Sequence, residues 1–307
     1  MGEPNIPRAM QKPRQVGSDA PFVVGLGIIG SAYVLLIVAM IVADAAFTTP
    51  GHLLAALDSP QIRYAIKLSL ISSSMTAVLS VWFAVPLGYL MSRSRFFGQG
   101  LTIESSAGSG MTTAWWLKGV FLRTLKHLLD AILDIPIVLP PLVMGLSLLI
   151  LFRTPVGQAI EGVFPVTYAV PSVILAQFSV ACAFAVRTMR VTFDQINPRS
   201  EQVALTLGCT RSQAFWMVAL PEARRGILTA GTLAWARALG EFGPIVVFSG
   251  ATRMRTEVLP TTVWLELSVG SIEAAVAVSL LMVMAAVLVL IVVRAAGADA
   301  GMPGVVQ

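Results

Sequence analysis

The stretch PRSEQVALTLGCTRSQAFWMVALP, residues 198–221, indicates two short helices joined by a glycine turn. Pro198 interrupts the preceding chain, and Ser200 is the expected N-cap of the first helix. Glu201 then lies in the first helical turn, where the helix dipole favours an acidic side chain. We expect Gly208 to end this helix, because glycine readily adopts the left-handed backbone of a helix C-terminus.

The second helix of this stretch is expected to begin at Thr210 or Ser212 and to end at Pro221. Apolar residues recur at helical spacing on both helices: Val203, Ala204, Leu207, Ala214, Phe215, Met217 and Val218. A stripe of this kind in an aqueous loop has no lipid to cover it, so it needs a protein partner.

The chain as a whole has the composition of a membrane protein. Of its 307 residues, 56% are hydrophobic and only 12% are charged, and the mean hydropathy is +0.81. A soluble domain carries about 25% charged residues. This composition excludes a soluble enzyme, a disordered chain and a nucleic-acid-binding protein, and indicates a chain that crosses a lipid membrane several times.

Six apolar stretches are long enough to cross a bilayer as helices, for which about 20 residues suffice. They are residues 22–47, 64–91, 128–152, 168–189, 227–248 and 271–293. We therefore expect an all-α polytopic fold. Its parts are an N-terminal tail (1–21), a first transmembrane helix (22–47), a core of five transmembrane helices (64–293) and a C-terminal tail (294–307).

The basic residues predict the orientation of these spans. With the N-terminus in the cytoplasm, the inner segments hold 15 of the 21 Lys and Arg residues and the outer loops hold four, while Lys67 and Arg237 lie within spans. Because cytoplasmic loops of membrane proteins are enriched in Lys and Arg, we expect both termini to be cytoplasmic. The net charge of +5 is then mostly a consequence of topology and not a sign of nucleic-acid binding.

Residues 98–126, on the expected cytoplasmic side, look inserted. A Gly/Ser/Thr-rich run at 105–113 has the composition of a flexible linker, and the Trp115-Trp116-Leu117-Lys118 run after it is consistent with a short helix at the membrane interface. A tolerated loop insertion without a role of its own is the alternative.

The sequence offers no set of residues for catalysis, metal binding or a cofactor. Its only histidines are His52 and His127, and Cys182 and Cys209 fall in different environments. The Gly-x-Gly-x-x-Gly pattern at 25–30 lies inside the first span, and a phosphate-binding loop is missing. We expect no cofactor, no metal and no enzymatic activity, so any ATP hydrolysis must come from another chain.

The spacing within residues 202–221 resembles the permease signature of ABC importers. The pattern reads Glu-Ala-Ala, three residues, Gly, nine residues, Ile, one residue, Leu-Pro. The matching positions are Gln202, Val203, Ala204, Gly208, Val218, Leu220 and Pro221, with departures at 202, 203 and 218. The resemblance implies that this helix pair docks in a groove of a cytoplasmic ATPase. Whether Glu201 replaces the acid missing at Gln202 stays open at this point.

Residues 234–244, AWARALGEFGP, narrow the resemblance to the permeases of molybdate, tungstate and sulfate importers. Further matches are DIPIVLPP at 134–141, TEVLP at 256–260 and EAA at 273–275, and the likeness covers residues 64–294 except 98–126. It implies a type I ABC importer permease fold in a bacterial-type inner membrane. It also implies a homodimer, an ABC ATPase subunit and an extracytoplasmic binding protein, with molybdate or tungstate favoured over sulfate.

Candidate residues for the translocation path lie in the third and fifth spans: Arg237, Gly240, Glu241, Gly243, Pro140 and Pro141. Arg237 and Glu241 are four residues apart and are expected on one helix face, either as a steadying ion pair or with Arg237 adding positive potential to an anion path. Glycine and proline allow broken helices, whose polar backbone can face a cavity. A six-span secondary transporter or channel is the alternative, but we find neither an inverted repeat nor a row of carboxylates for ion coupling.

Overall fold

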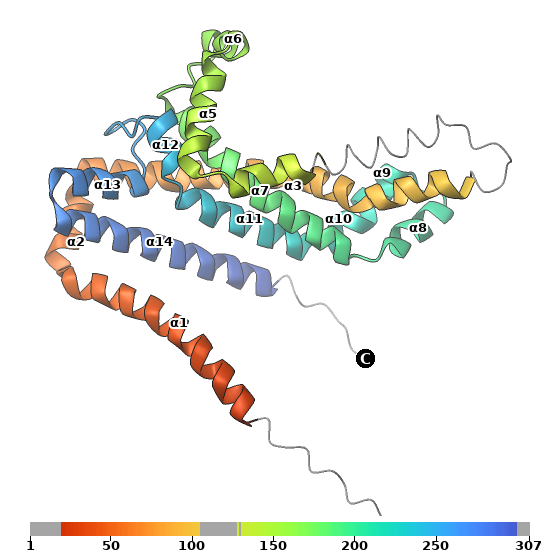
Figure 1. Cartoon of the computed structure of the whole chain (residues 1–307), viewed down its shortest axis with the longest axis horizontal. Helices are drawn as coiled ribbons and strands as arrows, with labels where there is room; N and C mark the ends of the chain where they lie inside the picture. Colours follow the sequence, from red (N-terminus) through yellow and green to blue (C-terminus); the bar gives the residue numbers. More distant parts are fainter. Residues whose placement is uncertain (1–19, 105–127, 129, 300–307) are drawn as a thin grey trace, which may run out of the picture. The chain divides into compact units, whose positions relative to one another are not determined.

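The computed structural model describes residues 20–104, 128 and 130–299, and every regular element in that part of the chain is a helix (Figure 1). The helices are α1 (Ala20–Phe47), α2 (Pro50–Asp58), α3 (Pro60–Glu104), Asp130–Val138, α5 (Pro141–Arg153), α6 (Pro155–Val163), α7 (Val170–Gln195), α8 (Pro198–Thr206), α9 (Arg211–Ala214), a π-helical segment (Phe215–Ala219), α10 (Leu220–Glu222), α11 (Arg224–Leu239), α12 (Gly243–Phe248), α13 (Leu259–Val269) and α14 (Ile272–Asp299). The all-α prediction is therefore confirmed.

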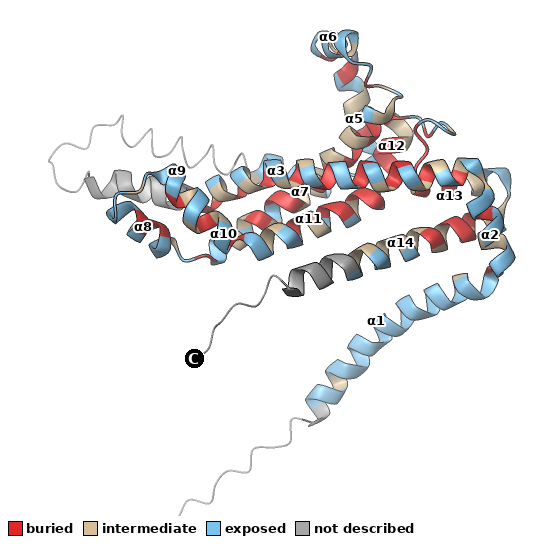
Figure 2. Ribbon diagram, turned by 180° about the vertical axis from the view of Figure 1, so that it is seen from behind, coloured by how far each residue is buried: buried red, intermediate tan, exposed pale blue. Residues whose placement is uncertain are grey.

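The chain divides into two units, Met1–Phe47 and Thr48–Gln307. The described part of the first unit is α1, an apolar helix of 28 residues whose described side chains are almost all exposed (Figure 2). An apolar helix without protein cover is suited to a lipid environment.

The core of the second unit lies between α3, α7 and α11, where buried residues face one another (Figure 2). Its contact surfaces are rich in fully buried alanines: Ala84, Ala181, Ala185, Ala230, Ala234 and Ala238. Gly88 of α3 also has no room for a larger side chain, because a Cβ there would lie 2.8 Å from the Cβ of Met189 on α7. Small side chains let transmembrane helices approach closely, so this trio forms a tight scaffold.

The six expected spans differ in their continuity. Four helices are long and apolar enough to cross a bilayer: Phe22–Phe47, Pro60–Arg93, Val170–Gln195 and Ile272–Ile291. The third expected span is a pair of helices, Asp130–Val138 and Pro141–Arg153, bent by 115°. The fifth is divided into α11, with 16 residues, and α12, with six. The described residues thus hold four helices that could each cross a membrane, or five spans if the bent pair counts as one, as in a multi-pass membrane protein.

Prolines and glycines account for the breaks. Pro141 is the first residue of α5, and its ring cannot continue the helix that ends at Val138. Gly240 caps the end of α11, and Pro244 lies at the start of α12. At the other end of the expected second span, α3 continues beyond residue 91 to Glu104. The linker and interfacial helix expected at 105–118 lie outside the described residues.

Candidate functional site

In the cytoplasmic arm expected at 198–221, the first helix begins three residues earlier than the sequence suggested, with Asn197 and not Ser200 as its N-cap. The side chain of Asn197 accepts a hydrogen bond of 3.0 Å from the backbone N–H of Arg199, and Pro198 is the first residue of α8. Ser200 is therefore inside the helix, and its prediction as the N-cap is wrong. Asparagine is as good a cap as serine, and proline is favoured at the first helical position.

The glycine turn has the expected form. Gly208 follows the end of α8 with a φ of +92°, a conformation that disfavours residues with a Cβ. Thr210 then caps α9: its hydroxyl accepts from the backbone N–H of Gln213, and the Gln213 side chain accepts from the backbone N–H of Thr210. This reciprocal capping box selects Thr210 over Ser212 as the start of the second helix.

Pro221 does not end the second helix, which corrects the expectation from sequence. It lies inside α10, and the chain passes through one break at Ala223 into α11. The five residues before α10, Phe215–Ala219, form a π-helical segment in which the N–H of Leu220 bonds to the carbonyl of Phe215. A π turn changes the backbone register just where a proline would otherwise meet the carbonyl four residues earlier.

Glu201 is turned into the molecule, where Arg93 of α3 holds it. Arg93 Nη2 lies 2.6 Å and Nε 2.9 Å from Glu201 Oε1, and only 6% of the Arg93 and 10% of the Glu201 side chain is exposed. The Tyr89 hydroxyl donates to Glu201 Oε2 at 2.8 Å. The same guanidinium donates to the carbonyls of Phe193 and Ile196, at the end of α7. We call Arg93, Tyr89 and Glu201 the arm clamp, because it joins α8 to both α3 and α7.

Sequence reasoning missed two of the three clamp residues. Arg93 counted only as one of the inner basic residues, and Tyr89 was part of an apolar span. The ring of Tyr89 packs edge-on against Phe193 and Phe215, with centroids 5.4 and 4.7 Å away. An arginine directly after an apolar span, 108 residues from the acid it binds, gives no local signal of such pairing.

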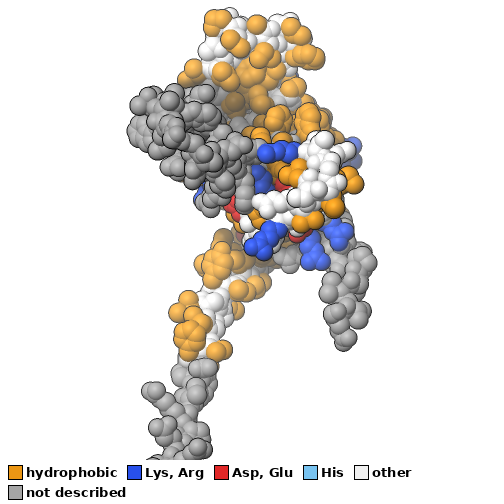
Figure 3. Space-filling model, turned by 90° about the vertical axis from the view of Figure 1, so that its right-hand side faces the viewer, with side chains coloured by type: hydrophobic (Ala, Val, Ile, Leu, Met, Phe, Trp, Pro, Cys, Tyr) orange, Lys and Arg blue, Asp and Glu red, His pale blue; other side chains and the backbone are white. Residues whose placement is uncertain are grey.

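The opposite face of the arm is exposed. Gln202 and Val203 point outward while Ala204 is buried, and large apolar side chains remain uncovered at its tip: Val203, Leu207, Trp216 and Met217. Figure 3 shows this end of the molecule, where hydrophobic side chains lie among Lys and Arg. The arm therefore presents an apolar surface with a basic margin, while its acidic residue, Glu201, is buried in the ion pair with Arg93.

Arg237 and Glu241 form an ion pair at the break of the fifth expected span. Arg237 Nη1 lies 2.5 Å from Glu241 Oε2, and 28% of the arginine but only 2% of the glutamate side chain is exposed. The helix ends at Leu239, so Glu241 lies beyond the helix end and not on its face as expected. The Arg237 guanidinium also lies 5.9 Å from the ring centre of Phe184 on α7. The cation is thus the more accessible member of the pair.

The two helix breaks pack against each other. A Cβ at Gly145 of α5 would lie 2.7 Å from Pro244 Cα, and a Cβ at Gly243 of α12 would lie 3.0 Å from Pro141 Cβ. Each glycine therefore packs directly against the proline of the other segment, with no room for a Cβ. Pro140, the neighbour of Pro141, is exposed, and a Cβ at Gly240 would meet only the Ala236 carbonyl of its own helix, 3.8 Å away. The structure brings Pro141, Gly243 and Pro244 together. Arg237 lies in the last turn of α11, just before this break, and Glu241 lies within it.

The family follows from the comparison with known proteins. The family model described as "Binding-protein-dependent transport system inner membrane component" matches residues 106–298. The chain belongs to this family. A probable molybdenum ABC transporter permease protein of Haloferax volcanii is 30% identical to this permease, over 89% of this chain and 88% of the relative. A molybdenum transport system permease protein of Mycobacterium tuberculosis is 31% identical, over 78% and 82%. A sulfate transport system permease protein of Salmonella typhimurium is 28% identical, over 76% and 75%.

Solved structures show the fold of this permease. A bacterial ABC transporter involved in the import of the acidic polysaccharide alginate matches with a TM-score of 0.59 and 18% identity, covering 91% of this chain and 95% of that chain. The MetNI methionine ABC transporter, in inward-facing conformations, matches with a TM-score of 0.52 and 16% identity, covering 79% and 99%. The expected ABC importer permease fold is confirmed.

Proposed function

We propose that this chain is the transmembrane permease subunit of an ATP-driven importer of a tetrahedral oxyanion, molybdate or tungstate first and sulfate second. Two copies would form the pathway, two ABC ATPase subunits would drive it, and an extracytoplasmic binding protein would deliver the anion. The relatives named for molybdenum, molybdate/tungstate and sulfate transport support this class of substrate. Both termini would lie in the cytoplasm of a bacterial-type cell, as the distribution of basic residues favours.

The observation that carries the coupling role is the division of the arm into a clamped face and a free face. The arm clamp fixes α8 to α3 and α7, so a displacement of α8 by an ATPase would move two long helices directly. The free face, with Val203, Leu207, Trp216 and Met217, is the surface that needs a protein partner. Glu201 then acts within the chain, and contact with the ATPase falls to Gln202, Val203, Gly208 and the second helix up to Leu220 and Pro221.

The breaks of the third and fifth expected spans are the proposed lining of the pathway. Arg237 would supply positive potential for an anion, and Glu241 beneath it would keep the site from holding the anion too tightly. Gly240, Gly243, Pro140 and Pro141 would open the backbone at this level.

Reconstitution with the ATPase and the binding protein tests the proposal. We expect uptake of molybdate to require ATP and all three kinds of subunit, and titration of the binding protein with molybdate, tungstate and sulfate to identify the anion. Uptake by the permease alone would favour a secondary transporter or channel and would contradict the proposal.

The glycine turn offers a matched test of coupling. Gly208→Val places a β-branched residue at positive φ, and we expect at least tenfold less ATPase to copurify with the permease. Gly208→Asn is the control, because asparagine tolerates this conformation better, and it should retain most of the ATPase. Equal retention by both variants would show that the turn does not position the arm for docking.

A further inference from the structure

A groove runs between α7 and α11 on their cytoplasmic halves. Its volume is about 760 Å³, and its walls include Arg187, Thr188 and Thr192 of α7, Arg225 and Thr229 of α11, and Phe184. Phe184 is also the ring beneath the Arg237 guanidinium. Residues 225, 229, 233 and 237 follow one another at four-residue intervals on α11, so the groove leads along one helix face from the arm to Arg237.

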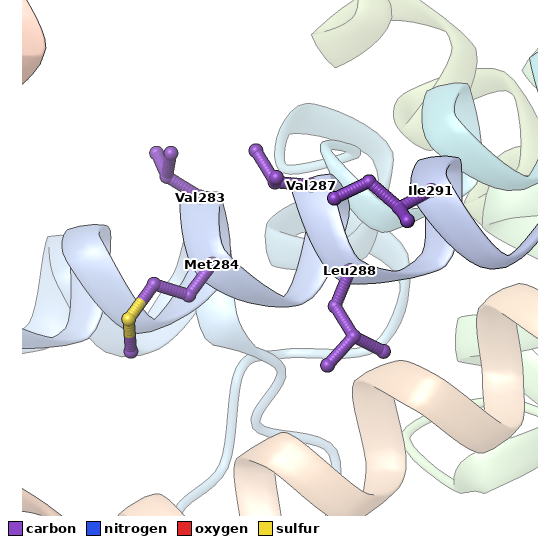
Figure 4. A pocket seen from close by; sticks show the side chains of 5 residues that line it. All are labelled: Val283, Met284, Val287, Leu288 and Ile291. Atoms are coloured by element: carbon purple, nitrogen blue, oxygen red, sulfur yellow. The ribbon is translucent and has the colours of Figure 1, made fainter.

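The charges of this groove distinguish it from a surface that faces lipid. Figure 4 shows such an apolar surface on α14, where all five lining side chains are hydrophobic: Val283, Met284, Val287, Leu288 and Ile291. The α7–α11 groove instead has two arginines and Glu222 among its lining residues. Charged side chains in contact with hydrocarbon are costly, so this groove faces water or protein.

The two groove arginines keep their guanidinium groups accessible. Arg187 lies 3.7 Å from Asp134, with 63% of the arginine and 53% of the aspartate side chain exposed, which is a weak and solvated pair. Among the described residues, Arg225 has no carboxylate within ion-pair distance. Both can therefore approach an anion in the groove.

The threonines of the groove have no free hydroxyl proton to donate to such an anion. The hydroxyls of Thr188, Thr192 and Thr229 each donate at 2.9 Å to the carbonyl four residues earlier in their own helix. Their protons are thus used within the helices, and the charged donors are the arginines. A wall with separated arginines and few other free donors suits passage, because an anion in transit must be attracted without being retained.

We propose that the α7–α11 groove is the cytoplasmic exit of the oxyanion path, with Arg187 and Arg225 receiving the anion after it leaves Arg237. The inference rests on the proposed function for the identity of the anion. The guanidinium groups would hold a tetrahedral dianion by charge-assisted hydrogen bonds before its release to the cytoplasm.

Cysteine reactivity tests the access and the charge of the groove without requiring transport. The two native cysteines of the complete transporter are first removed by Cys182→Ala and Cys209→Ser, and a single cysteine is then introduced by Thr229→Cys. This cysteine is treated from the cytoplasmic side with an anionic or a cationic methanethiosulfonate reagent. We expect the anionic reagent to react faster, and Arg225→Gln to slow it about threefold, the effect of one charge about 7 Å away in water. Arg224→Gln is the matched control, since the neighbouring arginine is exposed but does not line the groove.

Three results would overturn the proposal that the α7–α11 groove is the exit. An equal effect of Arg224→Gln would mean that only general surface charge is measured. A cysteine that is inert to both reagents would mean that the groove is closed. A disulfide between the Thr229→Cys residues of two copies would mean that a second permease fills it.

Transport provides the second readout. We expect Arg187→Gln to lower the anion imported per ATP hydrolysed three- to tenfold, and Arg187→Lys to restore part of it. Asp134→Asn removes the same ion pair but keeps the arginine, so it should transport like the wild type. Equal losses in Arg187→Gln and Asp134→Asn would show that Arg187 only supports the helix Asp130–Val138. If the unmodified transporter imports no oxyanion, the proposed function fails, while the reagent rates still report on the groove.

Discussion

The arm clamp and the pair at the span break join the same two residue types in opposite ways. In the clamp, Arg93 and Glu201 are both buried, and the arginine also satisfies two backbone carbonyls. At the break, Glu241 is buried but more than a quarter of the Arg237 side chain is exposed. A guanidinium whose three nitrogens all donate inside the protein, as in the clamp, is suited to holding a structure together. One that is neutralised from one side and open on the other can also meet a ligand.

Breaking the clamp is expected to have the largest effect. Glu201→Gln leaves the buried Arg93 without a counter-charge, and breaking a buried pair in this way costs about 3–5 kcal/mol. We expect a lower unfolding temperature of the purified permease and loss of the ATPase on copurification. Gln202→Glu is the control, since it places the family's acid on the exposed face and should change neither property much.

A double variant separates the charge from the contact. Replacing both members, Arg93→Met with Glu201→Met, removes the buried charges together, and we expect part of the lost stability to return. ATPase copurification should stay low, because the methionines do not bond to the end of α7. Full recovery of copurification would show that the clamp does not orient α8.

Arg237→Gln is expected to affect transport more than folding. The accessible cation would be lost, and we expect uptake of the anion to fall about tenfold while the unfolding temperature and ATPase copurification change little. Glu241→Gln would remove the opposing charge, so the anion should be held more tightly and the maximal rate should fall along with the half-saturating concentration. If Arg237→Gln instead destabilises the permease as much as Glu201→Gln, the pair is structural and the contrast with the clamp disappears.

The sequence predicted what depends on neighbours along the chain. Apolar length, the Gly208 turn and the Arg237–Glu241 pair all rest on spacings within one segment, and all appear in the structure. The N-cap was misplaced by three residues because Asn197 and Ser200 are chemically equivalent candidates. The clamp depends on a contact between residues 93 and 201. The packing at the sharp bend after Val138 depends on the contact between Pro141 of α5 and Gly243 of α12. Local sequence patterns indicate neither this contact nor the clamp.

The crossed contact between the two breaks is expected to be intermediate in effect. Gly145→Ala would place its Cβ 2.7 Å from a backbone atom of Pro244, so α5 and α12 must separate. We expect a loss of about 1–3 kcal/mol, typical of overpacking, and slower transport. Gly162→Ala in α6 is the control, because its Cβ meets nothing within 4 Å and should leave the unfolding temperature unchanged or slightly higher. Equal unfolding temperatures for both variants would mean that the breaks tolerate separation.

The smallest expected effect concerns Glu161, a carboxylate held by hydrogen bonds without an arginine. The Thr167 hydroxyl donates to it at 2.7 Å and the N–H groups of Thr167 and Val166 add to this, so the pKa of Glu161 lies below its ordinary value. A lowered pKa in the folded state means that the charged carboxylate stabilises the fold above its ordinary pKa, and that this contribution is lost as the pH falls through the lowered value. We expect the difference in unfolding temperature between the wild type and Glu161→Gln to shrink as the pH is lowered from about 7 to about 3. Thr167→Val, which removes the strongest of these hydrogen bonds, should move this loss to higher pH. A difference that stays constant with pH would show that the charged carboxylate of Glu161 contributes no more to stability than the amide of glutamine does.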